Sequence, residues 1–360
     1  MKKTPSLSRE AYIDMMNSYL SSKNYDKLLE CSREAVDACP DFAEAYVAMG
    51  LACSELKQHN QAIVAFQKVI AIDPDNVSAY CRMGNACDDL KDYKIAIACY
   101  QKAIAIDPNH AEAYYNTGLA CYNLHNDSEA MLYYQKAIAL NPNFVRAYSN
   151  MGNIYCNLKD YKAAIACYQK ATAIDPNYAE AYVNIGAAYG ALKNYREAIR
   201  YYQKAIALEP NLVQAYYNMG LDYGELESYH EAIQCYRKAI AIDPTLGQAY
   251  YSMGFEYYNL NDCNEAIRCY KKAIAIDPNH VQAYANMGVA YGTLNDYNEA
   301  VRCFQKAIAI DPNYAAAYYN MGFACYNLGN YDETMRCLKK AAQLGLSQAQ
   351  ESLRAVGENW

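Results

Sequence analysis

Histidine and cysteine are the side chains of this chain best suited to metal binding or nucleophilic chemistry. The sequence holds 5 His and 15 Cys, but it has no HExxH motif and no Cys/His spacing that suits zinc. His110 and His280 stand at equivalent places beside a predicted helix N-cap, where a solvated loop residue is expected. Phosphate-binding GxGxxG and GxxxxGK[ST] loops are also absent from the sequence. We therefore predict no catalytic residue, no metal site and no cofactor.

Most cysteines fall on two recurring places. Seven share one place and four share the other: Cys31, Cys99, Cys167, Cys235, Cys269, Cys303 and Cys337, then Cys53, Cys87, Cys121 and Cys325. Copies in neighbouring units would lie about a helix diameter apart, roughly 10 Å, which is too far for a sulfur cluster. The total is odd and no CxxC pair occurs, so reduced thiols that fill a core are expected.

Two carboxylates, Asp222 and Glu256, stand one 34-residue interval apart where most equivalent places carry Ala or Ile. We expect them to stack on a mostly buried stripe, where like charge should raise the pKa of at least one. They could form an acid pair, but no nucleophile or metal accompanies them. Partial exposure, or pairing with Lys or Arg, is the simpler interpretation, and their functional role stays open.

A row of nine lysines recurs at one place on the predicted second helix: Lys68, Lys102, Lys136, Lys170, Lys204, Lys238, Lys272, Lys306 and Lys340. Such a ridge could bind phosphate groups, but a solvated face near a helix C-terminus is the expected arrangement. The net charge of −7, from 32 basic and 39 acidic residues, also argues against a nucleic-acid partner.

All these residues belong to one repeating frame of 34 residues. Nine prolines, from Pro40 to Pro312, follow each other at that interval, and a glycine series from Gly50 to Gly322 has the same period. A fixed period of this length indicates a solenoid of stacked units.

One unit, residues 111–144, predicts an antiparallel helix pair. Asn109 and Glu112 would cap the first helix, and Asn126 with Glu129 would cap the second. Asn141-Pro142 would end the pair, because proline lacks a backbone donor and disfavours helix before it. Small residues mark the close contacts: Gly118 and Ala130 between the two helices, and Ala137 against the next unit. Tyr occupies the place of Tyr114 in all ten units, so the 40 Tyr are mainly a repeated core choice.

This pattern resembles the tetratricopeptide repeat family, whose mark is aromatic, small, aromatic, Ala, aromatic, Ala and Pro at fixed places. Those places are held here by Tyr114, Gly118, Cys121, Ala130, Tyr134, Ala137 and Pro142, with Tyr in place of the usual Trp. The resemblance implies an all-α, right-handed superhelical solenoid of antiparallel helix pairs. It also implies that the first helix of each unit lines the inner groove.

We predict three parts: an N-terminal extension over 1–8, ten units in a single solenoid domain over 9–348, and a capping helix and tail over 349–360. The first unit departs from the pattern at Met16, Leu28 and Ser32, and Gly345 replaces the last proline, as expected of end caps. No signal peptide and no transmembrane stretch is recognised. The expected location is cytoplasmic, although an effector exported without a cleaved signal would look the same.

The sixth position of the first helix carries a run of asparagines: Asn116, Asn150, Asn184, Asn218, Asn286 and Asn320. A side-chain amide both donates and accepts, so such a row could hold a peptide backbone regardless of its sequence. The row is similar to the asparagine ladder of O-GlcNAc transferases. The alternative is that Asn is simply common at this place in the family.

Two aromatic trios are the other candidate peptide-binding residues: Tyr251, Phe255 and Tyr258 in unit eight, and Tyr319, Phe323 and Tyr326 in unit ten. Their spacing puts each trio on one helix face, and unit nine between them carries small residues. A large–small–large wall predicts one ligand-facing pocket. Alternatively, the C-terminal helix or a second copy of the chain covers these rings.

We predict that the chain is not an enzyme and binds a protein or extended peptide in the groove, as a noncatalytic scaffold. Acidic residues outnumber basic ones at inward positions, so a partner with basic and aromatic or aliphatic side chains would suit it. The Lys required by the carboxylate clamp of chaperone-binding relatives is missing from the fifth positions. A self-assembling scaffold, or the regulatory subunit of an enzyme complex, remains the alternative. Neither a nucleic acid nor a membrane is expected as partner.

Overall fold

The computed structural model describes residues 7–355 and 357–359. Within them the chain forms 21 α-helices and no β-strand. The helices are α1 (Arg9–Ser21), α2 (Tyr25–Ala38), α3 (Ala43–Glu55), α4 (His59–Ile72), α5 (Val77–Asp89), α6 (Tyr93–Ile106), α7 (Ala111–Asn123), α8 (Asp127–Leu140), α9 (Val145–Asn157), α10 (Tyr161–Ile174), α11 (Ala179–Ala191), α12 (Tyr195–Leu208), α13 (Val213–Glu225), α14 (Tyr229–Ile242), α15 (Gly247–Asn259), α16 (Cys263–Ile276), α17 (Val281–Thr293), α18 (Tyr297–Ile310), α19 (Ala315–Asn327), α20 (Tyr331–Gln343) and α21 (Ser347–Ala355).

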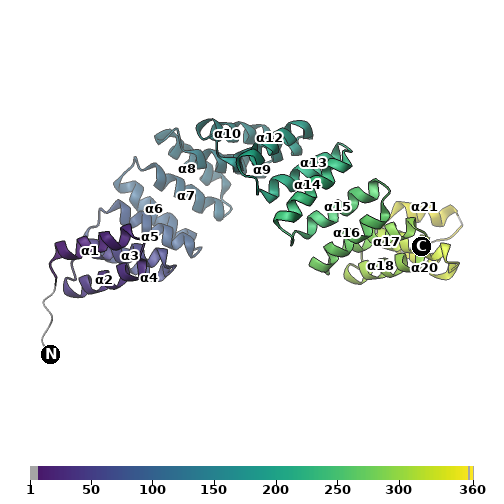
Figure 1. Cartoon of the computed structure of the whole chain (residues 1–360), viewed down its shortest axis with the longest axis horizontal. Helices are drawn as coiled ribbons and strands as arrows, with labels where there is room; N and C mark the ends of the chain where they lie inside the picture. The colour runs from purple at the N-terminus through teal and green to yellow at the C-terminus, as the bar shows by residue number, and fades with distance from the viewer. Residues whose placement is uncertain (1–6, 356, 360) are drawn as a thin grey trace, which may run out of the picture. The chain divides into compact units, whose positions relative to one another are not determined.

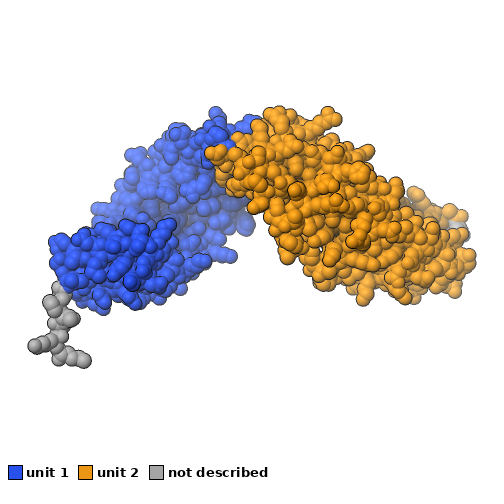
Figure 2. Space-filling model, in the orientation of Figure 1, with its two compact units in different colours: residues 1–176 blue, residues 177–360 orange. Residues whose placement is uncertain are grey.

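The helices follow the predicted pairing, with an odd-numbered and an even-numbered helix in each of ten units (Figure 1). The all-α tetratricopeptide-like architecture of helix pairs is therefore confirmed. The chain divides into two compact units, residues 1–176 and 177–360, which Figure 2 distinguishes by colour. That the ten helix pairs form a single domain stays a prediction.

Local capping explains where the helices of a pair begin. Asn126 caps α8 as predicted: its Oδ1 accepts from the Glu129 backbone N–H, and its Nδ2 donates to the Glu129 carboxylate at 2.7 Å. The predicted capping of α7 by Asn109 is wrong. His110 is the N-cap, and its Nδ1 accepts the Ala113 N–H at 3.1 Å. His280 caps α17 in the same way, so both half-buried histidines have a capping role that was not predicted.

In repeats two to nine the core contains an aromatic ring packed against a glycine. A Cβ added to Gly118 would lie 2.8 Å from Cε1 of Tyr134, and Ala130 and Ala137 are fully buried, so the predicted close contacts are confirmed. The six Tyr equivalent to Tyr134 are among the largest fully buried side chains: Tyr100, Tyr134, Tyr168, Tyr202, Tyr236 and Tyr270. The Tyr114 series is only half-buried except at Tyr12, so the deepest ring belongs to the second helix and not the first.

Odd-numbered helices of neighbouring repeats also touch each other within each compact unit. Contacts join α1 to α3, α5 to α7, α11 to α13, α13 to α15, α15 to α17, and α17 to α19. Within each compact unit, we call the surface that these helices present the odd-helix face. The predicted site residues lie on it.

The last helix, α21, begins at Ser347 and follows the tenth helix pair. Gly345 has φ +90° and ends α20, as predicted. Leu353 and Ala349 of α21 are buried in a cluster that includes Tyr318 and Tyr319. In the described residues, no helix is both long and apolar enough to cross a membrane.

Two glycine substitutions in the second compact unit should have opposite effects on stability. In Gly186→Ala the new Cβ would lie 2.5 Å from Cε1 of Tyr202, so this variant should lose about 2 kcal/mol through overpacking. In Gly292→Ala the new Cβ would meet no neighbouring atom within 4 Å. This variant should therefore become more stable by about 1 kcal/mol, because alanine has a higher helix propensity than glycine. Urea denaturation followed by circular dichroism measures both, and equal midpoints for the two variants would contradict the packing argument.

Candidate functional site on the odd-helix face

The ladder asparagines are half-buried, and several donate their amide protons to tyrosine hydroxyls of the preceding repeat. Asn150 Nδ2 lies 3.2 Å from the Tyr115 hydroxyl and 3.4 Å from the Tyr134 hydroxyl. Asn286 Nδ2 donates to the Tyr251 hydroxyl at 3.0 Å. The amides therefore provide hydrogen-bond partners for tyrosine hydroxyls that become partly or fully buried when the protein folds.

Where an asparagine also stands at the ninth position of a repeat, it is this asparagine that hydrogen bonds the buried tyrosine hydroxyl. The Tyr100 hydroxyl donates to Asn85 Oδ1 at 2.8 Å, and Asn116 Nδ2 donates to the same oxygen at 3.2 Å. The Tyr168 hydroxyl donates to Asn153 Oδ1 at 2.7 Å. One physical requirement, a partner for each buried phenol, thus places asparagines on this face.

The ladder keeps unused hydrogen-bonding capacity beyond this structural role. Among the described residues, no group donates to the side-chain oxygens of Asn150 and Asn286. Asn184 and Asn320 make no side-chain hydrogen bond there, whereas Asn218 Oδ1 accepts from Gln214 at 2.8 Å. Most of the ladder asparagines can therefore accept a hydrogen bond from an N–H group of a bound ligand.

The two aromatic trios do not line one common pocket. Phe323 lies with Val289, Gly292 and Asn320 around a pocket of about 240 Å³, which we call the Phe323 pocket. Tyr251 and Phe255 instead line a pocket of about 690 Å³ between α13 and α15, which we call the Glu256 pocket. The expected large–small–large wall is thus divided between two sites.

The remaining trio members have different surroundings. Tyr258 Oη lies 3.5 Å from the Thr293 hydroxyl. Tyr319 packs against the C-terminal cluster, which agrees with the alternative that the last helix covers it. Phe323 and Tyr326 are 62% and 58% exposed, and the Tyr326 ring meets the ring of Tyr331 edge-on at 5.6 Å. The end of the face therefore presents an aromatic patch.

Asp222 is only 7% exposed, and its Oδ2 has no hydrogen-bond partner in the described part of the chain. Burial, and after it the negative charge of Glu225, raises the pKa of Asp222 to about 7. Its carboxylate fits because the preceding repeat has Gly190, where an added Cβ would meet Asp222 Oδ1 at 3.0 Å.

Glu256 repeats this arrangement one unit later, over Gly224. It is 5% exposed, and its Oε2 accepts from Asn259 Nδ2 at 3.0 Å. Burial raises the pKa of Glu256, and Glu225 adds to the shift. The expectation of partial exposure or pairing with Lys or Arg is therefore wrong. The like charge that each acid senses is Glu225, which lies between them in the sequence.

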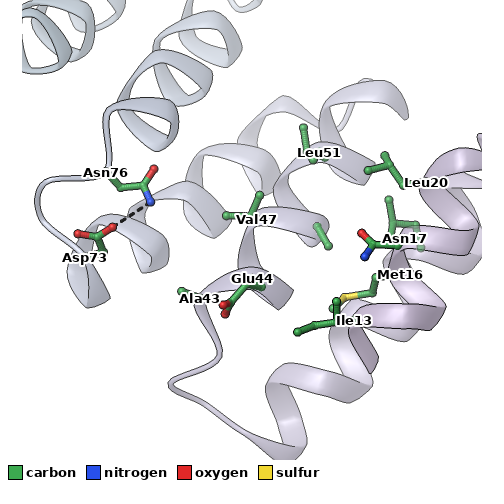
Figure 3. A pocket seen from close by; sticks show the side chains of 12 residues that line it. Ile13, Met16, Asn17, Leu20, Ala43, Glu44, Val47, Leu51, Asp73 and Asn76 are labelled. Atoms are coloured by element: carbon green, nitrogen blue, oxygen red, sulfur yellow. Dashed lines mark hydrogen bonds between the residues drawn. The ribbon is translucent and has the colours of Figure 1, made fainter. Parts of the chain in front are cut away.

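A mainly apolar pocket of about 390 Å³, not predicted from the sequence, lies between α1 and α3 and extends to Asp73 and Asn76. Figure 3 shows Ile13, Leu20, Val47 and Leu51 around it, with Asn76 donating to Asp73 at its edge. The available signal was Met16, which replaces the repeated glycine and lies in this lining.

The cysteines are all free thiols, and eleven of the fifteen are buried, as expected of core fillers. Within a single repeat, Cys87 and Cys99 lie near enough for each to influence the pKa of the other. Burial raises the pKa of Cys99 to about 12, which keeps it a protonated thiol. The nine recurring lysines are exposed, as predicted.

Comparison with protein-family models accounts for this architecture. Models described as tetratricopeptide repeat or TPR repeat match residues 50–87, 77–110, 111–144, 144–211, 213–246, 254–295, 293–329 and 315–344. These matches cover most of the chain. The chain belongs to the tetratricopeptide repeat family. Its repeats are of the kind that serves as a protein-interaction scaffold.

Solved tetratricopeptide structures resemble parts of the chain. MamA is 28% identical over 46% of this chain and 97% of its own, with a TM-score of 0.44. YrrB, a TPR protein with an unusual peptide-binding site, is 27% identical over 51% and 95%, with a TM-score of 0.46. The C-terminal part of a repeat protein from Cytophaga hutchinsonii is 20% identical over 65% and 96%, with a TM-score of 0.54. No curated protein matches the sequence significantly.

The raised pKa of Asp222 makes a prediction about stability and pH. Because the folded pKa of about 7 exceeds the ordinary value of 3.8, folding favours the protonated acid, and stability falls as pH rises through this window. Asp222→Asn should therefore stabilise the chain by about 2 kcal/mol at pH 8 and by less at pH 5. Urea denaturation at both pH values measures this, with the exposed Asp14→Asn as control. An equal effect of Asp222→Asn at pH 5 and pH 8 would refute the assignment.

Proposed function

We propose that this tetratricopeptide protein is a noncatalytic scaffold that binds an extended peptide or protein segment along the odd-helix face. The observation that carries the proposal is that the ladder asparagines use their amide protons and their side-chain oxygens differently. At Asn150 and Asn286 the amide protons are engaged by tyrosine hydroxyls, while the side-chain oxygens accept nothing from the described residues. Such oxygens are suited to peptide N–H groups, which every residue except proline offers.

Pockets between successive odd-numbered helices would select the side chains of the partner. The Phe323 and Glu256 pockets contain exposed aromatic rings, which commonly anchor binding partners. The pocket at Val47 and Leu51 is mainly apolar and would suit an aliphatic side chain. Backbone recognition by the ladder and side-chain selection by these pockets would together give affinity and specificity.

Asn184→Ala with Asn320→Ala tests the ladder without exposing a buried tyrosine. These two amides make no hydrogen bond among the described residues, so folding should be unaffected, whereas each lost contact to a peptide should weaken binding. We expect about a tenfold loss of affinity for the double variant. The probe is a fluorescein-labelled peptide selected on the full chain from a random displayed library, and fluorescence anisotropy gives its Kd.

Lys204→Ala with Lys306→Ala is the matched control, since both lysines are exposed on even-numbered helices. This control should bind the probe as the unaltered chain does. Equal affinity of the asparagine variant, or failure to select any peptide, would overturn the proposal.

Self-association through the aromatic patch is a second candidate function. Phe323 and Tyr326 of α19 and the neighbouring Tyr331 of α20 are each more than half exposed, and such rings are costly to leave in water. If copies pair there, light scattering should give a mass that rises with concentration for the unaltered chain. The mass of Phe323→Ser with Tyr326→Ser should then stay that of a monomer, and a concentration-independent monomer for the unaltered chain would exclude this role.

A further inference from the structure

The Glu256 pocket contains a buried hydroxyl without a hydrogen-bond partner. Tyr236 is 0% exposed, it belongs to the lining of the pocket, and its hydroxyl makes no hydrogen bond within the described residues. The cause is a substitution in the next repeat, where Ser252 stands in place of the ladder asparagine. Its shorter side chain lies near the hydroxyl without completing a bond. A buried phenol left in this state costs free energy unless a ligand satisfies it.

The charge of this pocket is entirely negative. Glu225, Glu227 and Glu256 line it, and no Lys, Arg or His does. Glu256 is the buried member, and only its Oε2 is engaged, by Asn259. Buried carboxylates of this kind normally have a cationic partner, and none of the described residues supplies one.

Aromatic rings complete the wall. Tyr229 and Tyr251 are half-buried in the lining, and Phe255 is exposed beside them. The faces of such rings attract cations, and a planar guanidinium can stack on a ring while it bonds a carboxylate. The carboxylates, the free phenol and the rings therefore share one kind of complementary ligand.

We propose that the Glu256 pocket binds a cationic side chain of the partner, with arginine favoured over lysine. The cationic group would lie between the carboxylates of Glu256 and Glu225 and stack on the ring of Phe255. It would also donate a hydrogen bond to the Tyr236 hydroxyl. This inference rests on the proposed peptide binding and specifies one residue of the bound segment. A metal ion is a poorer occupant, because no cluster of three or more suitable ligands exists in the described chain.

The Phe323 pocket provides an internal control on the same face. It has an exposed phenylalanine and a ladder amide but no carboxylate in its lining. A cationic ligand should therefore discriminate between Phe255 and Phe323, whereas a merely hydrophobic ligand should not.

The small number of phenylalanines makes a direct experiment possible. The chain has only 6 Phe, so labelling with 4-fluorophenylalanine gives few ¹⁹F resonances, and Phe255→Leu and Phe323→Leu assign the two of interest. The full chain is titrated with N-acetylarginine N-methylamide, its lysine analogue, its uncharged citrulline analogue and calcium chloride. We expect the Phe255 signal to shift saturably with the arginine probe, less with lysine, and not with citrulline. The Phe323 signal should stay unchanged.

Two conservative variants separate binding from folding. Glu256→Gln keeps the shape of the side chain and should weaken the arginine probe about tenfold. Tyr236→Phe removes a hydroxyl that has no partner, so thermal stability should hold or rise while probe affinity falls severalfold. Tyr168→Phe is the control, because it removes a satisfied hydroxyl and should lower stability without changing probe affinity.

The outcomes distinguish this inference from the proposed function. Equal shifts with arginine and citrulline, a response to calcium alone, or full affinity in Glu256→Gln would overturn the cation site. If the selected peptide still binds through Asn184 and Asn320, the scaffold function stands without it. If the arginine probe binds but no peptide does, the pocket remains and the extended peptide model fails.

Discussion

The structure depends on the burial of one tyrosine in most repeats. Its ring occupies the space that a glycine leaves between two helices, as Tyr134 does at Gly118, and this contact sets how closely the helices approach. The hydroxyl of that ring must still find a partner, because an unsatisfied buried polar group is costly. The glycine on the first helix of the same repeat and the asparagine on the first helix of the next repeat, such as Gly118 and Asn150 around Tyr134, both meet this single constraint.

This constraint joins the core of the protein to its binding face. An asparagine such as Asn150 donates its amide protons to the buried phenols of Tyr115 and Tyr134, while no described residue donates to its side-chain oxygen. The structural and the functional interpretation of the ladder are therefore not exclusive, because a primary amide has enough donors and acceptors for both. Where the amide is missing, at Ser252, the phenol of Tyr236 and the carboxylate of Glu256 together form a different kind of site.

Sequence patterns were most reliable where the same local interaction recurs ten times. The helix pairs, the small residues at Gly118 and Ala130 and the free thiols all follow from periodicity and are confirmed. They were weakest where a single position deviates. The burial of Asp222 and Glu256 could not be foreseen from their types, since it depends on the glycines that face them from the preceding repeat.

The 34-residue period by itself determined the fold class and which residues share the odd-helix face, because helical spacing converts sequence intervals directly into directions around an axis. Only the tertiary structure decided which of those residues meet. It divided the aromatic residues between two pockets, made His110 a cap and left Tyr236 without a partner. These outcomes depend on distances between neighbouring repeats, and side-chain hydrogen bonds fail when a group is short by one or two atoms, as at Ser252.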